Sequence, residues 1–177
     1  MEGLPGEDGA SANNRRSLPL PRQRANHERH MKIRDVLADK GSNIVTVWPD
    51  KPLARVPQVF DERGIASVVV VDHGDRPLGI VTDKEVLRAL ARIGTAALER
   101  PVSEAMQSPA PACSPLDDVN DVLRTMTEKR VRHVVVMDGR RMTGLVSIGD
   151  LVKFRLKDAE LENRVLRELA LTRLAAG

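Results

Sequence analysis

The chain has 177 residues and a formal net charge of +3, with 30% of its residues charged. This length suits one domain, or two small units that share a core. The charge is too small and too evenly mixed to indicate nucleic-acid binding by itself. With no Tyr, one Trp and two Phe, the core must be aliphatic. The single cysteine, Cys113, excludes an intrachain disulfide and is expected to be a small buried hydrophobic residue.

The N-terminal segment has no pattern typical of a folded element. Residues 1–30 are rich in Gly, Pro, Ser, Asn and Arg without helical or strand periodicity, and they predict a disordered tail. His27 and His30 have no cysteine or acidic cluster beside them, so we expect no metal site. The tail has no secretory signal, and no apolar run approaches the roughly 20 residues needed to cross a bilayer. We therefore expect a cytoplasmic protein without membrane contact.

The ordered part begins with a short helical entry over residues 33–37. A strand over 44–47 then precedes a helix that ends at Gly64, a residue typical of the position after a helix. Pro57 lies within that helix. If the helix starts early, Pro57 falls past its first turn, so the sequence predicts either a kink or a later start. The β-branched run over 65–71 is too continuous for a half-exposed strand, so we expect it to be buried on both faces.

The same order of elements occurs twice. After a turn, the first half continues with a strand over 78–81 and a helix from Thr82 to about Arg92. In the second half the entry segment is 102–106, and the edge strand is weakened by prolines. The remaining elements are expected at 110–113 (edge strand), 115–129 (helix), 131–137 and 142–146 (strands), and 153–174 (long helix). Leu161, Val165 and Leu169 lie four residues apart in the long helix, which we expect to pack on the body or on a partner chain.

One motif marks the end of each half. Residues 79–88 and 144–153 both read as Gly, two aliphatics, a hydroxyl residue, two variable positions, an acid, two aliphatics and a base. Such self-similarity indicates an internal repeat. The expected fold is α+β, with two β-α-β-β-α repeats over 31–97 and 98–157, followed by a C-terminal helix over 158–177.

The repeated motif has two interpretations. Thr82 with Glu85, and Ser147 with Asp150, fit the capping box of a helix N-terminus. Both motifs also end a buried strand where helix amides can meet an anion, and a carboxylate there can accept hydrogen bonds from ribose hydroxyls. The sequence leaves both interpretations open.

The two halves differ at the start of their central strands. Arg132 and His133 in the second half could serve solubility alone, or could hold a phosphate. The matching residues in the first half, Ala66 and Ser67, leave room for a flat ring. One half therefore offers space and the other offers charge.

This layout resembles a tandem pair of cystathionine β-synthase (CBS) domains, the Bateman module, over about residues 31–155. The segments 131–136, 144–150 and 64–66 carry the resemblance. It implies two repeats packed sheet to sheet about a pseudo-twofold axis, with two clefts between them, and a homodimer formed through helices. It also implies an adenosine nucleotide as ligand, with AMP first and ADP, ATP, NAD or S-adenosylmethionine as alternatives.

By this resemblance, each cleft takes its acid from one repeat and most of its base pocket from the other. The second cleft is expected to be weak or empty, because Glu85 replaces the expected Asp and prolines crowd the opposing strand. The main cleft would use Val45, Thr46, Ile65, Ala66, Ser67, Arg132, His133, Ser147 and Asp150, and the weaker cleft Thr82, Lys84, Glu85 and Val131.

The function expected from this reasoning is regulation, in which nucleotide binding changes a dimer or partner interface. No nucleophile stands beside a base, and neither a P-loop nor a dinucleotide-type glycine motif is present, so we do not expect an enzyme. Two alternatives remain: a structural dimerisation scaffold with empty clefts, and nucleic-acid binding through the basic N-terminal tail.

Overall fold

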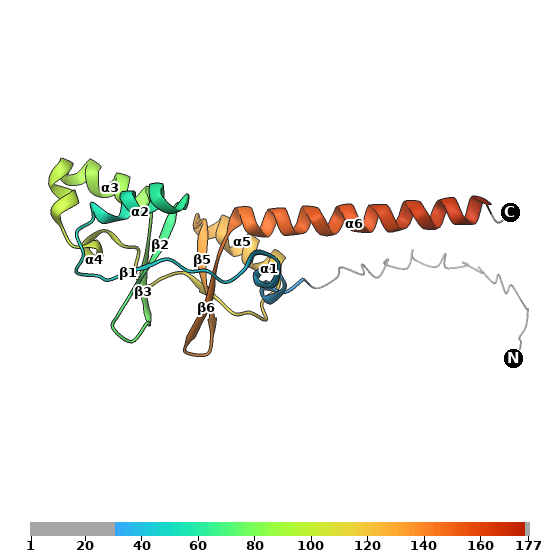
Figure 1. The fold of residues 1–177 in the computed structure, drawn as a ribbon, viewed down its shortest axis with the longest axis horizontal. Helices are drawn as coiled ribbons and strands as arrows, with labels where there is room; N and C mark the ends of the chain where they lie inside the picture. The colour runs from blue at the N-terminus through green and yellow to red at the C-terminus, as the bar shows by residue number, and fades with distance from the viewer. Residues whose placement is uncertain (1–30, 176–177) are drawn as a thin grey trace, which may run out of the picture.

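The structure, a computed structural model, describes residues 31–175; the predicted disordered tail lies outside this part of the chain. The described residues form two three-stranded sheets and their covering helices (Figure 1). In chain order the elements are α1 (Ile33–Lys40), β1 (Thr46–Val47), α2 (Arg55–Arg63), β2 (Ser67–Val71), β3 (Pro77–Thr82), α3 (Asp83–Ile93), the 3-10 helix η1 (Gly94–Glu99), α4 (Val102–Ala105), β4 (Ala112–Cys113), α5 (Val119–Lys129), β5 (His133–Asp138), β6 (Arg141–Ser147) and α6 (Ile148–Ala175).

The two sheets have the same construction. Their strand orders are β1-β2-β3 and β4-β5-β6, with a parallel outer pair and an antiparallel hairpin in each. Figure 1 shows the hairpins side by side, with helices beside the same end of each. The outer strands β1 and β4 have two residues each, so the prolines near β4 do not make it shorter than β1. The α+β fold expected from the internal repeat is confirmed.

The central strands carry the contact between the sheets. Every residue of β2 is buried, as the continuous β-branched run predicted. Val69 and Val71 of β2 form a buried cluster with Val135 of β5, and Leu145 of β6 packs against it. Valine favours this setting because a branched side chain packs well on a pleated surface and loses little freedom there.

Helices α2 and α5 end in the same backbone conformation but with different residues. Helix α2 starts late, so Pro57 falls within its first turn, and it ends at Gly64 with φ 62°. Helix α5 ends in the same left-handed conformation at Arg130, with φ 53°. A side chain in this conformation costs on the order of 1–2 kcal/mol, which glycine avoids. The second repeat therefore places a strained arginine where the first has glycine.

The entry helices are exchanged between the repeats. Ile33 and Val36 of α1, in the first repeat's sequence, are buried in the core of the second repeat. Val102 of α4, the entry to the second repeat, is buried in the core of the first. In Figure 1, α1 accordingly lies beside α5. Neither half can complete its core without the other.

The repeated glycine of the motif permits this crossing. A Cβ at Gly79 would lie 2.7 Å from Met106 Sδ and 2.8 Å from the backbone oxygen of Gln107, just after α4. A Cβ at Gly144 would lie 2.6 Å from Leu37 Cδ2 in α1. In each repeat the exchanged segment thus passes directly over the glycine of the hairpin.

We expect Gly79→Ala to destabilise the protein by about 1–3 kcal/mol, the usual cost of overpacking. Gly144→Ala should cost less, because the end of the Leu37 side chain can rotate away whereas the Gln107 carbonyl is part of the backbone. Urea unfolding followed by circular dichroism measures both values. Equal losses, or the reverse order, would contradict this explanation of the two glycines.

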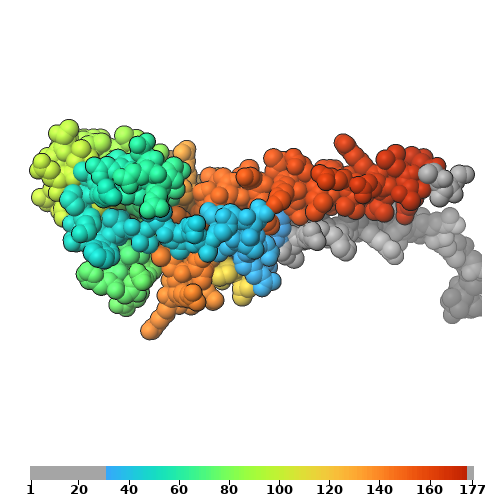
Figure 2. All heavy atoms as spheres, in the orientation of Figure 1, coloured from blue at the N-terminus to red at the C-terminus, as the bar shows by residue number. Residues whose placement is uncertain are grey.

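Helix α6 is longer than the sequence indicated. The helix that follows Ser147 and the separately predicted C-terminal stretch are one continuous helix of 28 residues. Its first turns pack on the second repeat, where Leu151 is fully buried and Phe154 contacts the core. The rest projects from the body, as Figures 1 and 2 show. Within residues 31–175, no helix combines the length and apolarity needed to cross a membrane.

Candidate ligand-binding site

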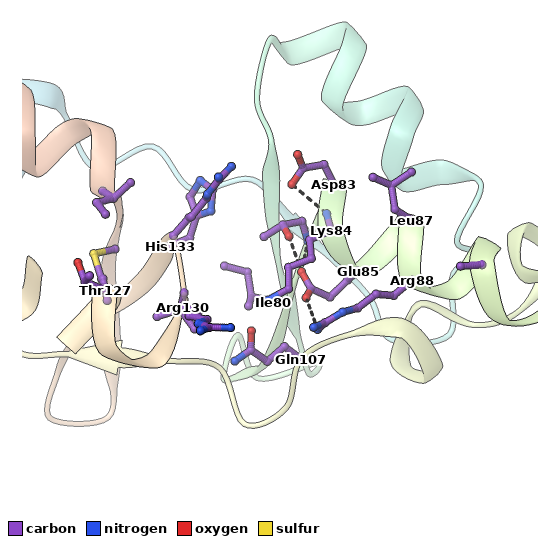
Figure 3. A pocket seen from close by; sticks show the side chains of 16 residues that line it. Ile80, Asp83, Lys84, Glu85, Leu87, Arg88, Gln107, Thr127, Arg130 and His133 are labelled. Atoms are coloured by element: carbon purple, nitrogen blue, oxygen red, sulfur yellow. Dashed lines mark hydrogen bonds and ion pairs between the residues drawn. The ribbon is translucent and has the colours of Figure 1, made fainter. Parts of the chain in front are cut away.

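A cavity of about 790 Å³ lies between the two repeats, at the N-terminus of α3. This volume falls within the range of roughly 300–1,000 Å³ that is typical of small-molecule sites. Figure 3 shows α3 on one side of the cavity and the segment that joins α5 to β5 on the other. Its lining is Ile80, Thr82, Asp83, Lys84, Glu85, Leu87, Arg88 and Ala91 with Gln107 from the first side, and Met126, Thr127, Arg130, Val131, Arg132, His133 and Ile148 from the second.

The capping interpretation of Thr82 and Glu85 is confirmed. The Thr82 amide donates to Glu85 Oε2 at 3.2 Å, and the Thr82 hydroxyl donates to the same oxygen. Arg88 Nη1 lies 3.6 Å from the other carboxylate oxygen, Oε1. Glu85 is only 5% exposed. Its oxygens are therefore engaged within the protein, and little of the carboxylate faces the cavity.

Asp83 is the exposed acid at this helix start. It is the first residue of α3, and Asp83 Oδ1 accepts a hydrogen bond from the Lys84 amide at 2.9 Å. The other carboxylate oxygen of Asp83 is available to a hydroxyl donor. Asp83 was not predicted as a site residue, because the repeated motif indicates the acid three residues after the hydroxyl residue.

Basic side chains outnumber acidic ones in the cavity. Lys84, Arg88, Arg130 and Arg132 face two carboxylates, those of Asp83 and Glu85. Across the described residues, Lys84, Arg130 and Arg132 form no ion pair with a carboxylate, in contrast to Arg88. Unneutralised cations beside a helix N-terminus favour an anionic ligand. Arg88, Arg130 and Gln107 were also missed from sequence, since their positions depend on how the repeats meet.

His133 lies at the centre of the arrangement. It is the first residue of β5, pairs in register with Ser147, and is half-buried. Its Nδ1 atom is buried with no hydrogen-bond partner among the described residues. Burial lowers the pKa of His133, while the negative charges of Asp150 and Asp83 act in the opposite direction. The imidazole is therefore neutral near pH 7, and the charges of Asp83 and Asp150 both act on it.

The pKa of His133 predicts how stability depends on pH. Because the folded-state pKa is lower than 6.5, the unfolded chain binds the proton first as the pH falls. The contribution of His133 to the free energy of unfolding is fully present above pH 6.5 and declines as the pH falls below that value. We expect His133→Gln to flatten this decline in melting temperature. An unchanged slope between neutral pH and the range where carboxylates titrate would contradict the assignment.

The second motif forms a similar cap with an additional partner. The Ser147 amide donates to Asp150 Oδ2 at 2.7 Å, and the Asp150 amide donates to Ser147 Oγ at 3.1 Å. Lys40 Nζ, at the end of α1, lies 2.6 Å from Asp150 Oδ2. Burial raises the pKa of Asp150, but the hydrogen bonds from Lys40 and Ser147 outweigh it and hold that pKa below its usual value. Lys40 and the Ser147 amide therefore both contact the same carboxylate oxygen, Oδ2.

The predicted site residues fall into two groups. All four residues of the cleft predicted to be weaker, together with Arg132 and His133, line the cavity. The predicted adenine wall, Ser147 and Asp150 do not line this cavity: Ser67 is buried, Ile65 and Val45 are half-buried, and Ala66 and Thr46 are exposed. Occupancy of either cleft by a ligand stays a prediction.

Cys113 is not part of this site. Burial is the main cause that raises its pKa to about 12, and the nearby charge of Asp117 adds to it. The thiolate that would act as a nucleophile is therefore scarce at neutral pH.

Comparison with known proteins identifies the class. The family model described as "CBS domain" matches residues 33–92 and 102–157, which together make up most of the chain. The chain belongs to the CBS-domain family and contains two copies of the domain. Proteins with such a pair are commonly regulatory, and some bind adenosyl ligands.

Individual relatives agree with this assignment. The crystal structure of a CBS-domain protein from Agrobacterium tumefaciens is 34% identical, has a TM-score of 0.69, and the match covers 73% of this chain and 96% of that one. A 33.4 kDa protein of Thermofilum pendens is 32% identical over 74% of this chain, which spans 39% of the relative's length. The CBS pair of protein MJ0100, solved in complex with 5′-methylthioadenosine and S-adenosyl-L-methionine, has a TM-score of 0.64 over 72% of this chain and 98% of that one. At 19% identity it shows the shared fold alone.

Proposed function

We propose that this protein is a regulatory CBS pair that binds an adenosine nucleotide in the cavity between its repeats. The observation that supports this most is that the α3 N-terminus lies across one cavity from Arg130 and Arg132, which pair with no carboxylate in the described part of the chain. The adenosyl ligands of the MJ0100 pair support the ligand class for the fold. Regulation follows if the ligand binds two states of a dimer or partner interface with different affinity.

The side chains that line the cavity indicate how a nucleotide would be oriented in it. Arg130, Arg132 and His133 would hold phosphate, to which arginine can donate in a fork. Asp83 would accept hydrogen bonds from the ribose, and the apolar side chains of Ile80 and Leu87 would contact the base. Four cationic side chains against two carboxylates favour AMP, ADP or ATP and disfavour the cationic S-adenosylmethionine.

The Asp150 carboxylate is proposed as a secondary site, in which Lys40 neutralises part of its charge through Oδ2. A nucleotide hydroxyl that approached Oδ2 would have to displace the Lys40 ammonium. Lys157 of α6 also pairs with Asp39 of α1, beside this contact. Binding in this cleft would therefore loosen α1 from α6.

A pair of variants decides which cleft binds first. Asp83→Ala is expected to weaken nucleotide binding by about tenfold, the scale of one hydrogen bond to a charged group. Asp150→Ala should leave the first binding event unchanged. Isothermal titration with AMP and ATP measures both affinities. The opposite result would move the main site to the Asp150 cleft that the sequence favoured.

The function itself is tested by a thermal-shift panel of AMP, ADP, ATP, NAD and S-adenosylmethionine on the purified chain. A nucleotide that binds the folded state raises the melting temperature. If no adenosyl compound shifts it and dimerisation does not respond to nucleotide, the scaffold alternative is correct. Steeply salt-dependent binding to nucleic acid, lost on removal of residues 1–30, would favour the third alternative. The absence of catalysis and a cytoplasmic location stay predictions from the sequence.

A further inference from the structure

The projecting part of α6 carries apolar side chains that the body does not cover. The helix leaves the second repeat after Phe154, and Figure 2 shows it extending away from the remaining domain. A helix that protrudes as a single rod gains no tertiary packing of its own, so helical propensity alone supports it weakly. The exposed large apolar residues after Phe154 are Leu156, Leu161, Val165, Leu166, Leu169, Leu171 and Leu174, with exposed fractions of 46–79%.

Three of these residues continue the stripe with which α6 packs on the body. Leu161 follows Phe154 by about two turns, and Leu169 follows Leu151 by about five turns, so each pair points in nearly the same direction. Val165 lies between Leu161 and Leu169 on that side. Leu161 and Val165 are also the least exposed of the set, at 49% and 46%. The core-facing stripe of α6 therefore extends past the edge of the core.

The charges beside the stripe indicate what covers it. Arg164 and Glu168 border it on one side, and Glu162 and Arg173 border it on the other. Each side thus carries both signs. A membrane surface or a nucleic acid would require a basic border. A mixed border is complementary to itself, because a second identical helix offers an acid for each base.

We propose that the stripe formed by Leu161, Val165 and Leu169 is the surface through which two copies of this chain associate. The contact buries the same residues on both helices, as a twofold interface requires. The nucleotide cavity lies between the two repeats, and none of the three stripe residues lines it. The inference therefore does not depend on ligand binding.

The test compares two double variants of the full chain by sedimentation velocity over a range of concentrations. The stripe variant is Leu161→Glu with Leu169→Glu. The matched control is Leu156→Glu with Leu174→Glu, which makes the same change on the opposite side, nine residues from Val165 in each direction. We expect the wild type and the control to dimerise alike. The stripe variant should dimerise at least about tenfold more weakly.

Three results would overturn the proposal: a monomeric wild type, a stripe variant that dimerises like the wild type, or a control that is equally weakened. Circular dichroism of the α-helical signal confirms that each variant is folded. A single cysteine at Val165 gives an independent readout, since Val165→Cys should cross-link two copies on oxidation and Leu156→Cys should not. The raised pKa of half-buried Cys113 keeps its own thiol from competing.

Other occupants of the stripe are distinguishable. Binding of a monomeric wild type to vesicles of phosphatidylcholine and phosphatidylserine, lost in the stripe variant, would assign the surface to a membrane and reject the second copy. The stripe variant should keep its thermal shift with ATP. A lost thermal shift in every variant, the wild type included, would reject the nucleotide proposal and leave the dimer proposal standing.

Discussion

Ile33→Ala is expected to lower the free energy of unfolding by about 2–5 kcal/mol, the usual cost of truncating a fully buried large aliphatic residue. Ile33 is 0% exposed, and its core partners include Met126 and Leu151 of the second repeat. The lost methyl groups would leave a cavity between α1 and α5, where rigid neighbours cannot close it. Urea unfolding measures the loss, with exposed Arg34→Ala in the same helix as the control.

The location of the effect tests the exchange of entry helices. Amide hydrogen exchange should quicken in α5 and β5 of the second repeat, although Ile33 belongs to the first repeat by sequence. Faster exchange confined to β2 and β3 would show that α1 serves its own repeat. A loss below about 1 kcal/mol would show that α1 adds little to the core.

Local patterns predicted much of this fold. The continuous valines of β2, the glycine after α2 and the two capping boxes each depend on residues near one another in the chain. Such signals reflect backbone geometry and burial, which a short window of sequence records. The late start of α2 is one of the two outcomes that Pro57 predicted, the other being a kink.

Features that depend on distant residues were not predicted. No local pattern indicates that α1 packs in the other repeat, or that Lys40 reaches Asp150. The family resemblance ranked the Asp150 cleft above the Glu85 cleft, while the open volume depends on how α3 faces the α5–β5 connection. Arg130 gave no signal as a site residue, because its place in the cavity arises from the left-handed end of α5. The charge of the cavity is therefore a property of the assembled pair.

Arg132→Ala is expected to weaken ATP binding by about 1.5–3 kcal/mol, the scale of hydrogen bonds to a charged group. Adenosine binding should change little, because the guanidinium would contact phosphate alone. Isothermal titration with both ligands gives the two values, and Arg140→Ala in the exposed β5–β6 turn is the matched control. Equal losses for ATP and adenosine would remove Arg132 from the phosphate role.

Arg130→Gly is a second test of the phosphate site, and it separates the effect on ATP binding from the effect on the free energy of unfolding. Glycine accepts the backbone at φ 53° without strain, so the free energy of unfolding should not fall, while the loss of the guanidinium should weaken ATP binding. Asp75, the other described non-glycine residue with positive φ, at 58°, provides the control in a turn outside the cavity. Asp75→Gly should likewise preserve stability and leave ATP affinity unchanged. If Arg130→Gly also leaves ATP affinity unchanged, the strained arginine does not serve the ligand, and the charge argument for a nucleotide would rest on Arg132 and Lys84.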